Sequence, residues 1–400
     1  MRITDALRCV AALLLACAMG VASAQPALSR SAPAPRIGVV TMAPGEIFWE
    51  RFGHDAIVVD DPRSGEATSY NFGYFDLAEP GFLGRFIRGR MQYMLVALPL
   101  EEDMRYYREV GRGATLQWLD LEPAQARQLA AELAENAKPE NARYRYDYYT
   151  DNCATRVRDA IDRAFGGQLQ RKLEVRSSGD SYRSESVRLA SPATWMWLGF
   201  DISLGPSADR PLSRWEQAFL PRRLADDLRE STHADGRPLV SSEQTLLPQR
   251  QVAEPVEQPR LLLPWLLLGL AVAALVAVGA RKAPRGIAGV AFAVWLLCGT
   301  IGLVLALAWA FTEHRALYAN RNLLLFNPLC LLLLPGGWAL LRARTPAPRF
   351  ALLLLIVAGL AALACLPLWL QAVPQRNGHW IALMLPVHAA FAWAWARRDA

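Results

Sequence analysis

The sequence predicts an α+β domain followed by an all-α bundle of five membrane-spanning helices. Apolar residues, 53% of the 400-residue chain, gather beyond residue 260 in five stretches. Each approaches or exceeds the roughly 20 residues that a helix needs to cross a bilayer. They lie near 261–280, 286–311, 322–341, 350–372 and 380–396. Before them, short β-branched runs alternate with segments of helical periodicity, which is typical of a mixed α and β domain.

The strand and helix patterns of the first domain are separated by clear turn residues. Two of the runs flank Asp61-Pro62 and Ser64-Gly65, which predicts a hairpin. Strands are expected at 37–42, 56–60, 68–75, 91–99 and 115–121, and helices at 124–136 and 153–165. The polar segment 242–260 contains three prolines and predicts a semi-stiff tether. The expected domains are therefore 25–241 and 261–396.

Residues 1–24 have the pattern of a secretory signal peptide. Arg2 and Arg8 precede an apolar run, and Ala22-Ser23-Ala24 fits a cleavage site before Gln25. A lipoprotein-type signal ending at Cys17 is a second interpretation, although its apolar stretch is short. Under either interpretation the domain that follows is exported.

Basic residues in the short loops predict the orientation in the membrane. The loops after the first, third and fifth stretches carry Arg281, Lys282, Arg285, Arg342, Arg344, Arg349, Arg397 and Arg398. Because cytoplasmic loops are enriched in Lys and Arg, the first domain is expected outside and the tail 397–400 in the cytoplasm.

Charge and residue types exclude several classes of function. Residues 25–260 carry 30 Lys and Arg against 34 Asp and Glu, a net charge of −4, so the net charge of +6 comes from the membrane part. This distribution does not indicate nucleic-acid binding, which needs a basic face on the folded domain. The sequence has no ligand-spaced cluster of His, Cys, Asp and Glu, so we expect neither a metal site nor a cofactor.

Cys153 is the only cysteine in the exported domain. The other five are in apolar segments: Cys9, Cys17, Cys298, Cys330 and Cys365. Exported thiols are usually oxidised into pairs, so a lone one requires an explanation. Cys153 begins the expected helix, with Asp151 or Asn152 as its N-cap, and a helix N-terminus favours a thiolate and offers free N–H groups to an oxyanion. A catalytic nucleophile is one interpretation, and a small buried apolar residue is the other.

A cysteine nucleophile needs a base, usually a histidine oriented by a third polar group. The exported domain has two histidines. His233 lies in a polar turn and is expected to be solvated, whereas His54 begins a strand. Asn71, on the other strand of the hairpin, is placed to accept the second imidazole N–H. The candidate catalytic residues are therefore Cys153, His54 and Asn71.

Three segments of the exported domain resemble the periplasmic domain of the Lnb family. They are F-W-E-R-F-G-H-D-A-I-V-V, Y-N-F-G-Y-F-D and Y-R-Y-D-Y-Y-T-D-N-C-A-T-R-V-R-D, and the similarity covers roughly residues 38–225. This family is implicated in N-acylation of bacterial lipoproteins. The order strand-His, strand-polar, helix-Cys also resembles circularly permuted papain-like enzymes, such as lecithin:retinol acyltransferase and relatives of the NlpC peptidases. In those enzymes the third residue is often a histidine, whereas here it is Asn71.

The resemblance extends to the membrane part and implies further substrate-binding residues. It involves His314, Asn320, Asn322 and the L-L-L-F-N-P-L run. The three side chains are expected near the outer membrane face, where they hold a headgroup or the acceptor amine, or else serve as ordinary interfacial caps. Arg156 is expected to form an ion pair or to contact phosphate. Tyr146 is expected either near the thiol or in strand packing.

Segment 81–95 alternates apolar and basic residues. It carries Phe82, Phe86 and Ile87 among Arg85, Arg88 and Arg90. One interpretation is a helix on the membrane surface with its arginines on lipid phosphates. The other is a packed helix with a solvated face.

The resemblance implies a thiol acyltransferase of the bacterial inner membrane. Cys153 would take an acyl chain from a phospholipid, and the chain would pass to the N-terminal amine of a diacylglyceryl lipoprotein in the periplasm. A cysteine peptidase or amidase acting on peptidoglycan is the second interpretation. A non-catalytic receptor or scaffold, in which the thiol is incidental, is the third.

Overall fold

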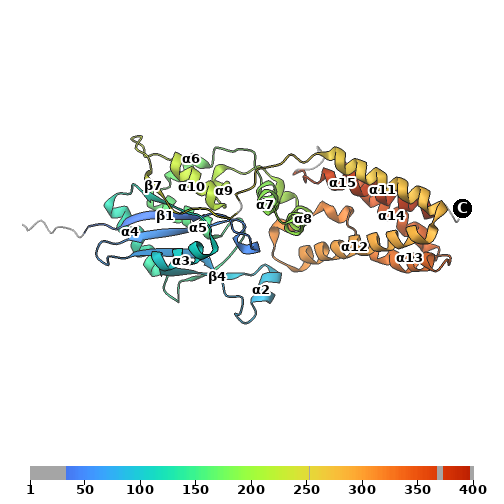
Figure 1. The fold of residues 1–400 in the computed structure, drawn as a ribbon, viewed down its shortest axis with the longest axis horizontal. Helices are drawn as coiled ribbons and strands as arrows, with labels where there is room; N and C mark the ends of the chain where they lie inside the picture. The colour runs from blue at the N-terminus through green and yellow to red at the C-terminus, as the bar shows by residue number, and fades with distance from the viewer. Residues whose placement is uncertain (1–32, 252, 367–372, 397–400) are drawn as a thin grey trace, which may run out of the picture.

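The computed structural model describes residues 33–251, 253–366 and 373–396. The expected signal peptide, with Cys9 and Cys17, and the tail 397–400 lie outside the described residues. The described chain forms a sheet domain and a helix bundle that lie end to end in an elongated molecule (Figure 1).

The first domain is built on a seven-stranded sheet with the order β6-β4-β3-β2-β1-β5-β7. Every pair of neighbouring strands is antiparallel. The strands are β1 (Arg36–Met42), β2 (His54–Asp60), β3 (Ala67–Tyr74), β4 (Gln92–Pro99), β5 (Ala114–Leu119), β6 (Arg143–Arg145) and β7 (Val240–Leu247). The five predicted strands are confirmed, and so is the β2–β3 hairpin, in which Ala56 lies opposite Asn71.

The predicted tether over 242–260 is wrong at its start, because residues up to Leu247 form edge strand β7. Most side chains of β7 are exposed, so the strand lacks the apolar alternation that would reveal it in the sequence. Glu243 accepts hydrogen bonds from Gln117 and Arg229. Beyond β7 the chain is held by an ion pair of Glu254 with Arg188.

Helices cover both faces of the sheet. On one face lie α4 (Pro123–Asn136), α5 (Cys153–Ala164) and α10 (Pro221–Glu230), and on the other α3 (Leu100–Val110). The apolar stripe of α5 packs into the first core, as its periodicity predicts. The shorter helices are η1 (Phe48–Glu50), α2 (Phe82–Arg88), α6 (Gln168–Leu173), α7 (Tyr182–Ala190), α8 (Thr194–Ser203), η2 (Pro206–Asp209) and α9 (Arg214–Gln217).

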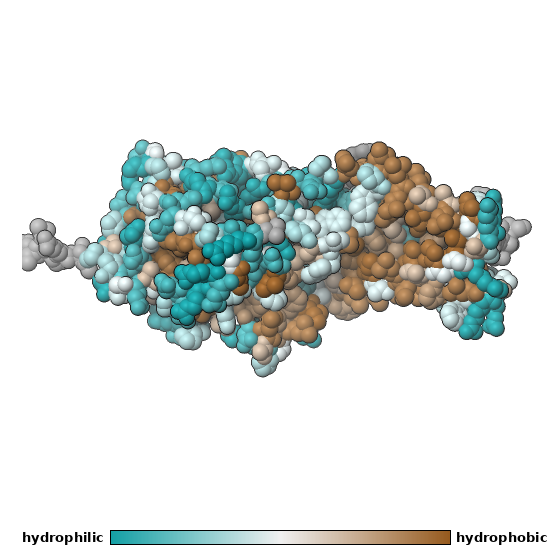
Figure 2. Space-filling model, viewed as in Figure 1, coloured by the Kyte–Doolittle hydropathy of each residue, from teal (hydrophilic) through white to brown (hydrophobic). Residues whose placement is uncertain are grey.

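The second domain is a bundle of apolar helices. Its elements are α11 (Leu262–Lys282), α12 (Pro284–Phe311), η3 (Arg315–Leu317), η4 (Arg321–Leu324), η5 (Pro328–Leu333), α13 (Leu334–Leu341), α14 (Arg349–Leu363) and α15 (Gly378–Trp395). Within the described ranges, three segments are long and apolar enough to span a membrane: Leu262–Lys282, Pro284–Phe311 and Arg321–Leu341. Figure 2 shows the hydrophobic surface of this half of the molecule. Spans at α14 and α15 stay predictions.

The third apolar stretch begins with short 3₁₀ segments instead of one α-helix. Pro328 has no N–H to donate, and the Asn327 side chain accepts from the Leu329 N–H instead. Gly302 of α12 permits close approach here, because a Cβ built on it would lie 2.3 Å from the Phe326 carbonyl oxygen. The backbone of this stretch therefore packs directly against α12.

Buried polar contacts join the two domains at the C-terminal end of α8. Asp201 pairs with Arg260 at 2.7 Å and with the His379 Nε2 at 2.5 Å, and it accepts a hydrogen bond from the Trp380 indole. The side chain of Asp201 is fully buried, so these partners replace its lost water. The orientation of the sheet domain on the bundle is fixed by these contacts.

We predict that Asn152→Ala destabilises the sheet domain. The Asn152 side chain accepts from the Thr155 N–H at 2.9 Å and donates to the carbonyls of Tyr148 and Phe219. Loss of the N-cap bond alone lowers the free energy of unfolding by about 1 kcal/mol. Thermal melting of the full chain in detergent, followed by near-UV circular dichroism, measures the effect.

Ser181→Ala is the matched control, because Ser181 caps α7 in the same way. It should lower the melting temperature without changing the reactivity of Cys153, whereas Asn152→Ala should change both. Unchanged melting of Asn152→Ala would contradict the role of this cap.

Candidate active site at the N-terminus of α5

Cys153 is the first residue of α5 and lies where strand β3 leaves its regular register. The β3–β4 pairing shifts between Phe72 and Tyr74, and Gly73 has a φ of +93°. A Cβ built on Gly73 would lie 3.6 Å from the Cβ of Cys153 and 3.7 Å from the Tyr146 ring. β2 and β3 are paired only from Ala56 and Asn71 onward. The helix N-terminus therefore meets the sheet at the end of β2 that pairs with β1 but not with β3. We call this the unpaired end of β2, because its β3 side lacks a partner.

Burial raises the pKa of the Cys153 thiol to about 12, and the Asp55 carboxylate acts in the same direction. Hydrogen bonds from the backbone N–H groups of Asp55, Ala154 and Cys153 lower this pKa but do not offset the burial. The expectation from the sequence that the helix N-terminus favours a thiolate is thus outweighed by desolvation. The resting thiol is protonated at neutral pH, and its activation requires a base.

His54, the first residue of β2, is oriented by Asn71. The His54 Nε2 lies 3.0 Å from the Asn71 Oδ1. An amide oxygen can only accept, so Nε2 carries the proton and Nδ1 keeps its lone pair. The Asn71 Nδ2 donates to Asp103 Oδ2 at 2.9 Å, which fixes the orientation of the amide. The structure thus brings together His54 and Asn71, as predicted.

Burial lowers the pKa of His54 below its usual 6.5, while Asp103 and the Asn71 hydrogen bond act in the opposite direction. The imidazole is therefore neutral at neutral pH. A neutral imidazole and a protonated thiol do not form an ion pair in the resting protein.

Asp103 and Ser69 belong to the same polar chain and were missed from the sequence. Asp103 is buried on α3, and it accepts from the Ser69 hydroxyl at 2.6 Å as well as from Asn71. In the sequence Asp103 is one of three adjacent acidic residues in Glu101-Glu102-Asp103. Only the packing of α3 on the sheet shows which of the three faces Asn71.

The imidazole and the thiol approach from opposite faces of the sheet. His54 points with Asn71 toward α3, whereas α5 covers the other face. In the described chain no hydrogen bond joins His54 to Cys153. The two groups can meet only at the unpaired end of β2, where the Asp55 N–H faces the sulfur. Catalytic hydrogen bonds are often long before a substrate binds.

Asp55 is a further buried group at this point of the sheet. Its Oδ1 accepts from the Thr41 hydroxyl at 2.7 Å, and its Oδ2 has no hydrogen-bond partner among the described residues. Burial raises the pKa of Asp55 to about 7. The raised pKa favours the protonated carboxyl, which limits the negative charge near the thiol.

Arg156 and Tyr146 both lie near Cys153, but with different surroundings. Arg156 forms an ion pair with Asp151 and lies 4.1 Å above the Tyr144 ring centroid. The expected ion pair is therefore present. Tyr146 packs on Tyr93, with ring centroids 4.3 Å apart, next to Gly73. Their predicted roles in substrate binding stay predictions.

The predicted residues of the membrane part lie at the junction of the two domains. The His314 Nε2 lies 2.9 Å from the Phe86 carbonyl oxygen, and its ring stacks on Tyr148. Asn320 and Asn322 are buried and donate to the carbonyls of Ile202 and Ser203. This geometry supports a structural role for the two asparagines, and a substrate-binding role stays a prediction.

His233 is not solvated as expected. It is half-buried, packs edge-on against Phe165 at 5.0 Å and lies 3.4 Å from Asp120. These contacts come from the core side of the turn, which the polar local sequence does not reveal.

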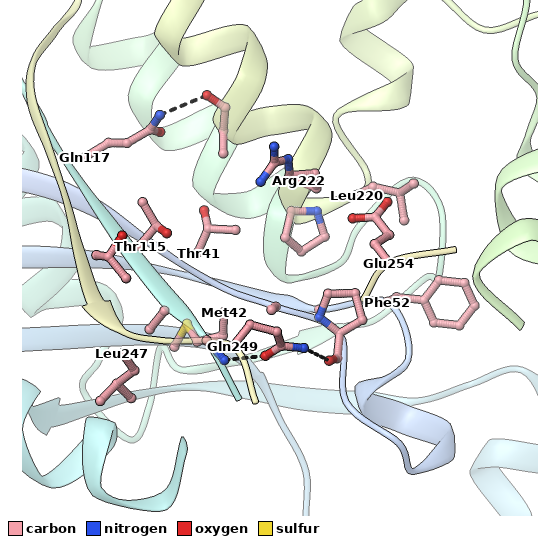
Figure 3. A pocket seen from close by; sticks show the side chains of 18 of the residues that line it. Thr41, Met42, Phe52, Thr115, Gln117, Leu220, Arg222, Leu247, Gln249 and Glu254 are labelled. Atoms are coloured by element: carbon pink, nitrogen blue, oxygen red, sulfur yellow. Dashed lines mark hydrogen bonds between the residues drawn. The ribbon is translucent and has the colours of Figure 1, made fainter. Parts of the chain in front are cut away.

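A cavity of about 380 Å³ lies between α10 and strands β1, β5 and β7 (Figure 3). Its lining includes Thr41, Phe52, Gln117 and Arg222, but neither Cys153, His54 nor Asn71. It borders the Thr41–Asp55 pair without opening onto the candidate catalytic residues, so we assign it no part in the chemistry.

Two family models match the chain. The Lnb N-terminal periplasmic domain matches residues 24–192, and the Lnb transmembrane domain matches residues 254–398. The chain belongs to the Lnb family. Searches of curated proteins and of solved structures found no match.

Membership of the Lnb family indicates a membrane protein of the lipoprotein N-acyltransferase type, with a periplasmic N-terminal domain. The first match contains all the candidate catalytic residues. It ends before α10 and β7, although α10 packs on the same sheet and β7 is one of its edge strands. The second match covers the whole helix bundle.

We predict that Asp103→Asn slows acylation of Cys153 by roughly 10- to 100-fold, the size typical of a residue that orients another functional group. Asp103 raises the pKa of His54, so its neutralisation lowers that pKa further. His54 then stays unprotonated to lower pH, and the acidic limb of the pH–rate profile shifts to lower pH. Release of p-nitrophenol from a short-chain ester by the full chain in detergent measures both effects.

Glu102→Gln is the matched control, because Glu102 is the exposed neighbour of Asp103 on α3. It should leave both the rate and the pH profile unchanged. A profile of Asp103→Asn with a slower rate but an unmoved acidic limb would show that Asp103 acts on something other than His54.

Proposed function

We propose that this chain transfers an acyl chain from a phospholipid, through a thioester on Cys153, to the N-terminal amine of a lipoprotein. The proposal rests mainly on two consecutive hydrogen bonds, from Asn71 to Asp103 and between His54 and Asn71. His54 is followed directly by Asp55, whose backbone N–H faces the thiol. This arrangement supplies a neutral, oriented base at the end of the sheet where the protonated thiol of Cys153 lies.

In the first half-reaction the Cys153 Sγ attacks the ester carbonyl carbon while His54 Nδ1 takes the thiol proton. Backbone N–H groups of Cys153 and Asp55 already point at the sulfur and are candidate donors to the oxyanion. The carbon–oxygen bond to the glycerol then breaks, and His54 returns the proton to the departing oxygen. The products are a lysophospholipid and the thioester.

In the second half-reaction the free α-amine of the lipoprotein attacks the thioester carbonyl. His54 accepts a proton from the amine, the carbon–sulfur bond breaks, and the proton returns to the sulfur. An amide forms and the resting thiol is regenerated. An amide carbonyl is much less reactive toward a thiol than an ester or a thioester, so the second half-reaction is not readily reversed.

The arrangement supports a permuted papain-like fold for the sheet domain. In papain-like enzymes a cysteine at a helix N-terminus is paired with a histidine that an amide orients. Here the histidine and the asparagine come from paired strands that precede the cysteine helix in the chain. Asn71 is accordingly proposed as the third catalytic residue.

Fusion to apolar helices favours a membrane substrate over a soluble one. Both a phospholipid and a diacylglyceryl lipoprotein are confined to the bilayer surface, so an enzyme tied to that surface meets them at a high effective concentration. We place the sheet domain on the periplasmic face of the inner membrane and the C-terminus in the cytoplasm. A peptidoglycan amidase would use the same residues but would gain nothing from the bundle.

Complementation tests this function directly. In a Gram-negative strain depleted of its own lipoprotein N-acyltransferase, the wild-type chain should restore growth and add an N-acyl mass to a model lipoprotein. Cys153→Ala and His54→Ala should restore neither, although both insert and fold. Asn320→Ala tests the junction at the same time and should reduce protein level rather than the activity per molecule.

Rescue by the wild-type chain and also by both Cys153→Ala and His54→Ala would overturn the mechanism and would favour a non-catalytic role. Failure of all of them at normal expression would overturn the acyltransferase function, and peptidoglycan cleavage would then be the next assay.

A further inference from the structure

Large apolar side chains are exposed on the end of the sheet domain that adjoins the bundle. We call this surface the membrane-facing rim. It consists of Leu83 and Ile87 of α2, Trp49 of η1 with the preceding Ile47, and Trp195 of α8. Their exposed fractions are 67%, 57%, 43%, 52% and 66%. A soluble domain seldom exposes such a group without a partner.

Aromatic contacts make the rim one continuous surface. Phe48 of η1 stacks on Trp195 with centroids 6.0 Å apart, which links η1 to α8. Trp49 meets Phe75 edge-on at 6.2 Å, and Phe75 stacks on Phe82 of α2 at 5.7 Å. Figure 2 shows hydrophobic atoms below the hydrophilic body of the sheet domain, at the place of α2 in Figure 1.

Contacts with the bundle fix the height of α2 relative to the membrane. The Glu313 N–H donates to the Arg88 carbonyl at 2.8 Å, and the Arg90 side chain pairs with Glu313. Glu313 follows the last residue of α12, Phe311, by two positions. The backbone of α2 is therefore held at the level where α12 leaves the bilayer.

We propose that the membrane-facing rim inserts into the surface of the same bilayer that the bundle spans. The side chains of the rim would contact the headgroups and the upper part of the acyl chains of the phospholipid leaflet. Leu83 and Ile87 are four residues apart, so they lie on one side of α2, and burial of both aliphatic side chains in the leaflet would be favourable. Trp is enriched at membrane interfaces, and the exposed Arg88 lies where lipid phosphates would be.

The rim also leads toward the thiol. Phe82, on the inner side of α2, stacks on Tyr93, and Tyr93 packs on Tyr146. Tyr146 adjoins Gly73, against which Cys153 lies. These rings, of which Phe82 and Tyr93 are buried, pack α2 against the surroundings of Cys153, so an acyl ester held at α2 would lie close to the thiol. This consequence rests on the proposed function, whereas insertion of the rim does not.

Photo-crosslinking of the full chain tests the insertion. Benzoylphenylalanine is placed at position 83, 87 or 175 in nanodiscs of phosphatidylethanolamine and phosphatidylglycerol, and adducts are read by mass spectrometry. Val175 is the matched control, because it is 85% exposed but lies between α6 and α7, away from the rim. Phospholipid adducts at 83 and 87 but not at 175 support the proposal.

The absence of lipid adducts at positions 83 and 87, or adducts only to protein at these positions, would overturn the proposed insertion of the rim. The readout does not depend on activity, so a failed acyltransferase function and a failed rim are distinguished.

Charge insertion tests the consequence for catalysis. Leu83→Glu combined with Ile87→Glu should slow acylation of Cys153 from bilayer phospholipid by roughly tenfold or more, since the lost insertion exceeds 1.4 kcal/mol. Acylation from a soluble short-chain ester should be unchanged, as should both rates in Val175→Glu. An equal loss with the soluble and the bilayer donor would contradict the role of the rim in donor access.

Discussion

The structure depends on the contact between the N-terminus of α5 and the unpaired end of β2. Gly73 lets β3 leave its register there, and the opening receives Cys153. Any other residue at position 73 would have to adopt a positive φ that only glycine adopts without strain. Cys153 and His54 lie on opposite faces of the sheet and can approach each other at this end of β2.

The electrostatics of the site follow from the same burial. The sheet and the aromatic cluster remove water from the thiol, so the pKa of Cys153 rises while that of His54 falls. Both groups rest in their neutral forms. In the proposed mechanism, the protonated thiol would become reactive only when His54 takes its proton. A position of the candidate active site next to the lipid surface is consistent with its burial, because a lipid substrate could then enter it without bulk water.

The features that depend on local sequence were predictable, and those that depend on packing were not. Helix α5 with its cap, the β2–β3 hairpin and the His54–Asn71 pair follow from periodicity and turn residues. Asp103 was not recognisable, because only the packing of α3 selects it from its acidic neighbours. Edge strand β7 has too few buried residues to show a pattern. The protonated thiol likewise reflects burial that no local motif records.

An acyl group detected on Cys153 would be the most direct sign of the proposed thioester. The full chain is incubated in nanodiscs with a phospholipid carrying isotopically labelled acyl chains, without a lipoprotein acceptor, and is digested for mass spectrometry. We predict a labelled acyl mass on the Cys153 peptide, removable by neutral hydroxylamine and absent from His54→Ala. Wild-type protein without this adduct, or with the label on another residue, would contradict a Cys153 thioester.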